Sequence, residues 1–158
     1  MSRLFARILP LLVCLCLLLP LRAAAQDVPN LDMDGLRTLL AQHKGRVVML
    51  NFFATWCPPC RAEIAEIGRI YPHYEKQGVT LIGLSVDDDK SKIAPFVKKQ
   101  GIAWPVYTVG ADVARTYQIF SIPHNAIYGK DGKLVLSEPG VADEQGLRSL
   151  FDELLKKD

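Results

Sequence analysis

Hydrophobic and polar positions follow two different periods along the chain after residue 30. The runs Val47–Phe53 and Val79–Val86 are apolar on both faces, which is typical of strands inside a sheet that is covered on each side. Elsewhere, apolar residues recur at steps of three and four among charged residues, which predicts amphipathic helices. These helices are expected over Leu36–Leu40 with an end at Gly45, after Cys60 with an end at Gly78, and over Lys90–Gln100, Ala111–Gln118 and Glu144–Lys157.

The remaining pattern predicts how the sheet is completed. Trp104–Val109 is expected to be a further short strand or extended segment. The residues Gly129–Gly132 (GKDG) contain Asp-Gly between the apolar runs Ala126–Tyr128 and Lys133–Ser137, which is a strong hairpin signal. Strands that alternate with helices through Gln118 indicate a parallel α/β core, and the hairpin adds an antiparallel pair. We therefore expect a central mixed sheet with helices on both faces.

Two local features modify this pattern. Pro72 falls within the helical stretch after Cys60, and it is expected to kink or end that helix near Tyr71. Asp87, Asp88 and Asp89 could bind a hard cation, but no EF-hand spacing or terminal Glu follows them. We interpret the three acids as capping the next helix.

The N-terminal region has the pattern of a targeting segment. Arg3 and Arg7 precede the dense apolar run Ile8–Leu21, and small residues then lead to a cleavage position between Ala25 and Gln26. This order predicts a secretory signal peptide over residues 1–25, followed by one domain over residues 26–158. The alternative is a retained membrane anchor, although the apolar run is shorter than the roughly 20 residues that span a bilayer.

Removal of the expected signal peptide changes the charge of the protein. The whole chain of 158 residues has a formal net charge of +2, but residues 1–25 contain three arginines and no acid. The mature chain would carry 16 basic and 17 acidic side chains, so its charge gives no case for nucleic-acid binding. Cys14 and Cys16 lie in the apolar run, so the mature protein would keep two cysteines in a compartment where disulfides persist.

Those two cysteines, Cys57 and Cys60, enclose Pro58 and Pro59 where the first strand gives way to a helix. Prolines at the first helical positions cost no intrahelical hydrogen bond. The unpaired N–H groups and the helix dipole favour the thiolate of Cys57, because cysteines so placed have pKa values lowered from about 8.5 to roughly 3.5–7.5. Cys60 can then attack a mixed disulfide formed at Cys57. The spacing predicts a dithiol–disulfide couple in which Cys57 attacks and Cys60 resolves.

Two other interpretations of the same cysteines are weaker. Half of a zinc site would need a second C-x-x-C or a His-x-x-x-His pair, and the sequence has neither. A purely structural disulfide would close so short a loop that it constrains the unfolded chain little.

Residues 51–64, NFFATWCPPCRAEI, resemble the active-site segment of the thioredoxin superfamily. The resemblance is to the TlpA/ResA/CcmG-like branch of extracytoplasmic thiol–disulfide oxidoreductases, and it extends over most of the chain after residue 30. It implies a thioredoxin-like fold with an extra strand–helix unit in the middle of the chain. It also implies no cofactor other than the Cys57–Cys60 disulfide, and no metal.

The same resemblance assigns residues to substrate binding. Trp56, Pro58 and Pro59 would lie at the surface that a substrate meets. Pro123 would follow a cis peptide bond and face the cysteines, with Ile122 offering backbone groups to an extended substrate segment. From sequence alone an X-Pro bond is cis in only about 5–6% of cases, so this expectation comes from the family.

The residues after Pro123 depart from the family pattern. Relatives usually have Thr-Thr-Phe or Glu-Thr-Phe there, whereas this chain has His124, Asn125 and Ala126. His124 either tunes the thiolate and titrates near neutral pH, or is a plain residue at the start of a strand. The sequence leaves both open.

Asn51 and Glu63 bear on proton transfer. Thioredoxins carry a buried Asp at the position of Asn51, and the TlpA/ResA-like branch commonly has Asn there together with a Glu three residues after the second cysteine. Glu63 has this position, on the same helix face as Cys60. A carboxylate there could exchange a proton with the resolving thiol. The alternative is a solvated helix residue like Glu66.

The resemblance implies a reductase that acts on exported protein disulfides and is kept reduced by a membrane thiol–disulfide donor. Apocytochrome c and copper-site proteins are the expected substrates, although direction depends on reduction potential rather than on the motif. Two other classes remain. Cys57 and Cys60 could capture Cu(I) in a metallochaperone-like module. A thiol peroxidase would share the fold, but its Pro-x-x-x-Thr-x-x-Cys pattern is absent because Thr55 is only two residues before Cys57.

Overall fold

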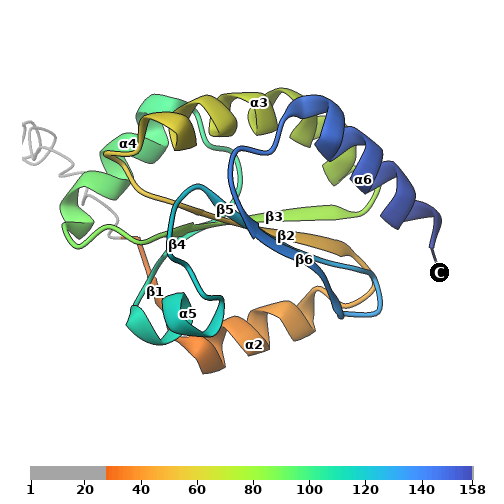
Figure 1. Ribbon diagram of the computed structural model, residues 1–158, viewed down its shortest axis with the longest axis horizontal. Coiled ribbons are helices and arrows are strands. Elements are labelled where there is room, and N and C mark those ends of the chain that lie inside the picture. Colours follow the sequence, from red (N-terminus) through yellow and green to blue (C-terminus); the bar gives the residue numbers. More distant parts are fainter. Residues whose placement is uncertain (1–27, 158) are drawn as a thin grey trace, which may run out of the picture.

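The computed structural model describes residues 28–157, which form a three-layer α/β/α arrangement (Figure 1). Within this range a six-stranded mixed sheet has the order β1-β4-β3-β2-β5-β6. Neighbouring strands are parallel from β1 to β2, and β5 and β6 each run antiparallel to the preceding strand. The strands are β1 (Asn30–Leu31), β2 (Val47–Phe53), β3 (Val79–Ser85), β4 (Val106–Val109), β5 (His124–Tyr128) and β6 (Leu134–Pro139). The expected mixed sheet and C-terminal hairpin are confirmed. The expected signal peptide lies outside the described residues.

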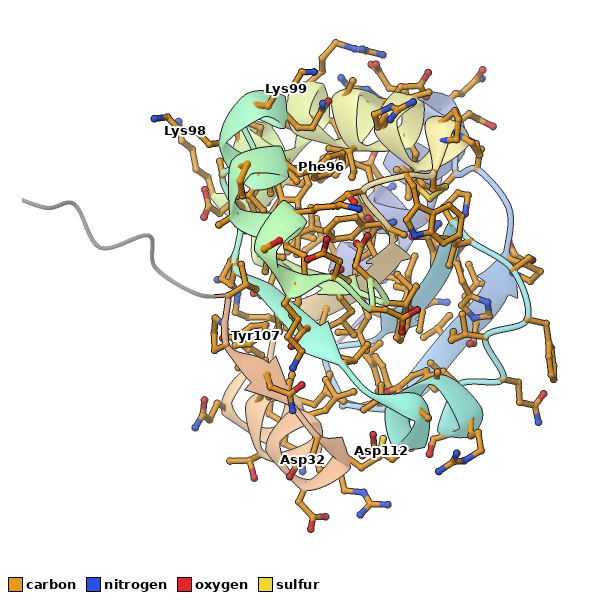
Figure 2. All side chains as sticks on the ribbon, turned by 90° about the vertical axis from the view of Figure 1, so that its left-hand side faces the viewer. Asp32, Phe96, Lys98, Lys99, Tyr107 and Asp112 are labelled. Carbon is orange, nitrogen blue, oxygen red and sulfur yellow. A yellow bond between two sulfur atoms is a disulfide. The ribbon has the colours of Figure 1, made fainter. Side chains whose placement is uncertain are left out.

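Helices cover both faces of this sheet. Figure 1 shows α3, α4 and α6 on one face and α2 and α5 on the other. Figure 2 shows how α4 is oriented: Phe96 points into the interior, whereas Lys98 and Lys99 point outward. The helices are α2 (Met33–Gln42), α3 (Pro58–Glu75), α4 (Ile93–Gln100), which follows the 3-10 turn Lys90–Lys92, α5 (Ala111–Thr116) and α6 (Glu144–Lys156).

The central strand β2 is buried along its whole length, which explains its continuous apolar sequence. Met49 and Phe53 pack in the core under α3 and α6, whereas Leu50 and Phe52 pack in the core on the α2 side. Successive side chains of a strand alternate between faces, so the two cores share one strand.

The same alternation applies to β5, which pairs with β2. Asn125 lies opposite Asn51, and His124 lies opposite Phe52. Asn125 therefore faces the α3 side of the sheet, and His124 faces the α2 side. Two adjacent residues after Pro123 thus belong to different environments.

Capping residues fix the ends of several helices. The carboxylate of Asp32 accepts a hydrogen bond from the N–H of Gly35 at the start of α2. Asp112 at the start of α5 accepts from the N–H of Met33, which ties α5 to α2 on this face (both acids are labelled in Figure 2). Gly101 ends α4 in the left-handed conformation that glycine adopts without strain.

The elements differ from the sequence pattern at two places. Pro72 does not end its helix, because α3 continues to Glu75. Tyr74, beyond the proline, is buried against Phe151 of α6, and its hydroxyl donates to Asp152, so tertiary contacts hold the last turn. Asn30–Leu31, for which the sequence pattern gives no strand prediction, forms β1 at the edge of the sheet beside β4.

Candidate active site

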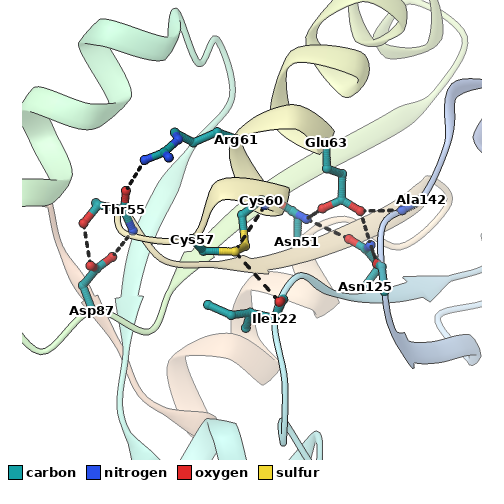
Figure 3. Close-up of a disulfide and its surroundings, with 11 residues drawn as sticks. Asn51, Thr55, Cys57, Cys60, Arg61, Glu63, Asp87, Ile122, Asn125 and Ala142 are labelled. Atoms are coloured by element: carbon teal, nitrogen blue, oxygen red, sulfur yellow. Dashed lines mark hydrogen bonds between the residues drawn. A yellow bond between two sulfur atoms is a disulfide. The ribbon is translucent and has the colours of Figure 1, made fainter.

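A disulfide joins Cys57 to Cys60 at the start of α3, with an S–S distance of 2.00 Å (Figure 3). Cys57 is the N-cap residue, and Pro58 and Pro59 occupy the first helical positions. The backbone N–H of Cys60 donates a hydrogen bond to Cys57 Sγ over 3.2 Å. One free donor of the helix N-terminus is therefore directed at the sulfur of Cys57, and together with the helix dipole it favours negative charge there.

The two cysteines differ in their access to solvent. Cys60 is fully buried, whereas Cys57 retains an exposed fraction of 3%. Trp56 is 66% exposed, and Pro58 and Pro59 are also exposed. The structure thus places Cys57 at the edge of a protruding apolar surface and Cys60 beneath it.

The loop before β5 lies against this disulfide. The peptide bond between Ile122 and Pro123 is cis, as the family resemblance implied. The carbonyl oxygen of Ile122 lies 3.9 Å from Cys57 Sγ (Figure 3). An oxidised sulfur has no proton to donate, so this is a contact rather than a hydrogen bond. Ile122 is half-buried, and Pro123 is buried.

Glu63 lies one turn after Cys60 and is fully buried. Its Oε2 accepts from Asn51 Nδ2 over 2.7 Å, and its Oε1 accepts from Asn125 Nδ2 and from the N–H of Ala142, each over 2.7 Å (Figure 3). The alternative that Glu63 is a solvated helix residue is therefore wrong. Burial raises the pKa of Glu63 above its usual value, and the three donated hydrogen bonds oppose this shift only in part.

Asn125 is a site residue that the sequence did not identify. Besides holding Glu63, it accepts a hydrogen bond from Asn51 Nδ2 over 2.8 Å, so the two amides and the carboxylate form one buried network. The available signal was the strand period after Pro123, which places the second residue of β5 on the same face as Asn51.

His124 lies on the other face of the sheet, away from Glu63. It is 3% exposed, its Nε2 lies 2.9 Å from Ser137 Oγ, and its ring stands edge-on to Phe52. Burial lowers the pKa of His124, with a smaller opposing effect from Glu138. Burial therefore disfavours the charged form of His124, which belongs to the core on the α2 side.

Asp87 has a different role from the expected helix cap. Its carboxylate accepts from the N–H and the hydroxyl of Thr55, over 2.9 and 2.7 Å, and from the hydroxyl of Ser85 over 2.7 Å (Figure 3 shows the bonds to Thr55). Asp87 is 7% exposed, so it joins the end of β3 to the loop that precedes Cys57. Within the run Asp87–Asp89, only Asp89 is a cap: it accepts a hydrogen bond from the N–H of Ser91 at the start of the 3-10 turn Lys90–Lys92.

The structure records neither a metal-binding cluster nor a membrane span in the part of the chain that it describes. Among residues 28–157 no three His, Cys, Asp or Glu side chains gather so that they could hold a metal ion. A Cu(I) site made by Cys57 and Cys60 alone would have two ligands, so the absence of a three-residue cluster does not bear on it. No helix in the same range is long and apolar enough to cross a bilayer.

A buried cysteine pair that forms a disulfide at a helix N-terminus, beside a cis-proline loop in an α/β/α domain, defines a thiol–disulfide oxidoreductase of thioredoxin-like fold. Comparison with known proteins agrees with this class. Residues 21–137 match the AhpC/TSA family, so the chain belongs to that family.

Among individual proteins, the chain is similar in sequence to thiol–disulfide oxidoreductases named ResA. The thiol–disulfide oxidoreductase ResA of Bacillus thuringiensis subsp. konkukian is 32% identical over 136 residues, which cover 84% of this chain and 76% of ResA. ResA of Bacillus subtilis is 32% identical over 122 residues, covering 75% and 68% of the two chains.

Solved structures share the fold. A putative thiol:disulfide interchange protein DsbE from Chlorobium tepidum has a TM-score of 0.69 at 23% identity, covering 73% of this chain and 84% of its own. A thioredoxin-family thiol:disulfide interchange protein from Chlorobium tepidum TLS has a TM-score of 0.68 at 27% identity, covering 73% and 83%.

The contacts of Asp87 generate a stability prediction. Asp87→Ala removes the acceptor of three hydrogen bonds, so the hydroxyl proton of buried Ser85 and the half-buried Thr55 donors lose their acceptor. We expect the free energy of unfolding to fall by about 1–3 kcal/mol, measured by urea denaturation of the oxidised protein. Asp88→Ala is the matched control, because Asp88 is exposed and its loss should change stability by less than about 0.5 kcal/mol. Equal effects of the two substitutions would contradict the assigned role.

Proposed function

We propose that this protein is an extracytoplasmic reductase of disulfides in exported proteins, and that a membrane thiol–disulfide donor keeps it reduced. One observation carries the chemistry: the Cys57–Cys60 disulfide lies at the N-terminus of α3 and beside the carbonyl of Ile122. A signal-peptide pattern before residue 26 supports an extracytoplasmic location. The direction of electron flow and the candidate substrates, apocytochrome c and copper-site proteins, rest on resemblance to the ResA-like branch.

The reaction would proceed through one mixed disulfide. The Cys57 thiolate attacks one sulfur of the substrate disulfide, so a new S–S bond forms and the other substrate sulfur leaves as a thiolate. The Cys60 thiolate then attacks Cys57 Sγ, which releases the second substrate thiolate and closes the Cys57–Cys60 bond. Two electrons pass to the substrate, and the membrane donor returns two electrons by the reverse exchange.

The geometry supports distinct roles for the two cysteines. The N–H of Cys60 and the helix N-terminus stabilise the Cys57 thiolate, which is the better-exposed of the two sulfurs. Trp56, Pro58 and Pro59 offer exposed surface to a polypeptide. The backbone of Ile122 can pair with an extended substrate segment beside the exchanging sulfurs.

Glu63 is the proposed proton acceptor for Cys60. It lies on the buried side of the same helix, one turn along, and water does not reach it directly. Burial raises the pKa of the Glu63 carboxyl toward the pKa of a thiol, and a smaller difference between the two pKa values favours proton transfer between the groups. Asn51, Asn125 and the N–H of Ala142 would hold the carboxylate in place while the proton moves.

The order of attack leads to a trapping prediction. Cys57→Ser removes the nucleophile, and we expect disulfide exchange to be lost. Cys60→Ser leaves the first step intact and removes the second, so mixed disulfides between Cys57 and substrates should accumulate. Non-reducing electrophoresis and mass spectrometry of exported proteins would detect them. The double variant Cys57→Ser/Cys60→Ser is the control that should trap nothing. The absence of any trapped partner in Cys60→Ser would sink the proposal.

The proton role of Glu63 predicts a changed pH dependence. The ionised carboxylate accepts the proton of Cys60, so the rate of the resolving step should rise with pH through the raised pKa of Glu63. In Glu63→Gln this rise should disappear. At pH values above the pKa of Glu63, the rate of the resolving step should be about 10²-fold lower than in the wild type, measured by single-turnover kinetics. Glu66→Gln on the same helix is the control and should keep the wild-type profile. An unchanged profile in Glu63→Gln would remove Glu63 from the mechanism.

The free energy of unfolding should depend on pH through the ionisation of Glu63. Because burial raises the pKa of Glu63, its stabilising contribution is present in full below about pH 4.5, where the unfolded chain also holds the proton. The contribution is lost as pH rises through the folded-state pKa. The free energy of unfolding of the wild type should therefore fall relative to Glu63→Gln over that range.

A further inference from the structure

A cavity of about 780 Å³ opens on the α2 and α5 side of the sheet, behind the cis-proline loop. Ser121 and His124 both line it, and these residues flank the Ile122–Pro123 bond on either side. The loop that brings the Ile122 carbonyl to Cys57 therefore also supplies a wall of this cavity. We call the cavity the flank groove.

The flank groove has an apolar rim that is exposed to solvent. Phe120 is 92% exposed and Leu134 is 50% exposed, and both line the groove together with the buried Tyr117. Large apolar side chains left in solvent beside an active site commonly mark a place where another molecule packs. Phe120 stands only two residues before Ile122, which links the rim to the exchange site.

The charged side chains that line the groove are all positive. Arg37 of α2 and Lys44, which follows that helix, line it, and none of its described lining residues is acidic. Arg37 pairs with Asp34 over 3.0 Å, but both side chains are largely exposed, so this ion pair holds the arginine weakly. The aliphatic part of Lys44 lies against Gly132 in the β5–β6 turn, close to Leu134 at the rim.

A buried polar atom in the wall lacks a partner. His124 Nε2 is hydrogen-bonded with Ser137 Oγ, whereas His124 Nδ1 has no hydrogen-bond partner within residues 28–157. Buried polar groups are nearly always paired in native proteins, so this nitrogen is an exception on the groove side of the sheet.

We propose that the flank groove binds an acidic and apolar stretch of the substrate polypeptide, next to the cysteine that exchanges with Cys57. This inference rests on the proposed function, because it assumes a protein disulfide as substrate. A chain paired with Ile122 leaves the exchange site along the loop toward Ser121, and each extended residue advances it by about 3.3 Å, so a few residues reach the groove. Its carboxylates meet Arg37 and Lys44, and its apolar side chains pack on Phe120 and Leu134.

The test compares two peptides that differ only in charge. Each has one cysteine, held as a mixed disulfide with 2-mercaptoethanol, and flanks of leucine with either glutamate or lysine. The reduced wild-type protein should reduce the glutamate peptide about fivefold faster than the lysine peptide. Arg37→Gln/Lys44→Gln should abolish this preference. All variants should reduce 2-hydroxyethyl disulfide at the wild-type rate, because that molecule is uncharged and too short to reach the groove.

The matched control removes the same charge elsewhere. Lys76→Gln/Lys99→Gln alters exposed lysines at the ends of α3 and α4, and Lys99 points outward from the opposite face of the sheet (Figure 2). This variant should keep the preference, which separates the groove from a general effect of net charge. Phe120→Ser should slow both peptides and leave 2-hydroxyethyl disulfide unaffected.

Three results would overturn the inference. They are a wild type without preference, a preference that survives Arg37→Gln/Lys44→Gln, and an equal loss in the control variant. These failures are distinct from failure of the proposed function, in which reduced wild-type protein would not reduce even 2-hydroxyethyl disulfide.

Discussion

The antiparallel pairing of β5 with β2 determines where each group of the active site lies. β2 delivers Cys57 at its carboxyl end, and β5 begins directly after the cis peptide bond beside that cysteine. Their register sets Asn125 opposite Asn51 under the redox helix and His124 opposite Phe52 on the other face. A shift of one residue would exchange these two environments, because successive side chains of a strand point to opposite faces. The pairing therefore separates the buried network of Asn51, Glu63 and Asn125 from the groove that His124 lines.

The two ionisable parts of the exchange site lie in opposite electrostatic environments. The sulfur of Cys57 receives an N–H and the positive end of a helix, which favours its charged form. The carboxyl of Glu63 is taken out of water, which favours its neutral form. A carboxyl group with a raised pKa lies closer in pKa to a thiol, so proton exchange between Glu63 and the proposed partner Cys60 would cost less free energy.

Local patterns were sufficient for the scaffold and for the dithiol itself. The apolar run of β2, the two prolines and the helical period after Cys60 specify a strand, a turn and a helix that follow each other in sequence, so no distant contact is needed to infer them. The cis bond before Pro123 could be expected only from family resemblance, because an isolated X-Pro bond gives little local signal. The partners of Glu63 were not foreseen, since Asn125 and Ala142 lie 62 and 79 residues away along the chain. Asp87 was misassigned for the same reason: its run of acids has a local explanation, but its bonds to Thr55 span 32 residues.

The reduction potential of the Cys57–Cys60 couple in the mature protein tests the central claim most directly. It can be measured by equilibration against glutathione and dithiothreitol, with the oxidised fraction read by thiol labelling and mass spectrometry. The account predicts a reducing potential, near the roughly −270 mV of a reducing dithiol protein. A value near about −120 mV, as found for a disulfide-forming oxidant, would contradict the proposed direction of electron flow.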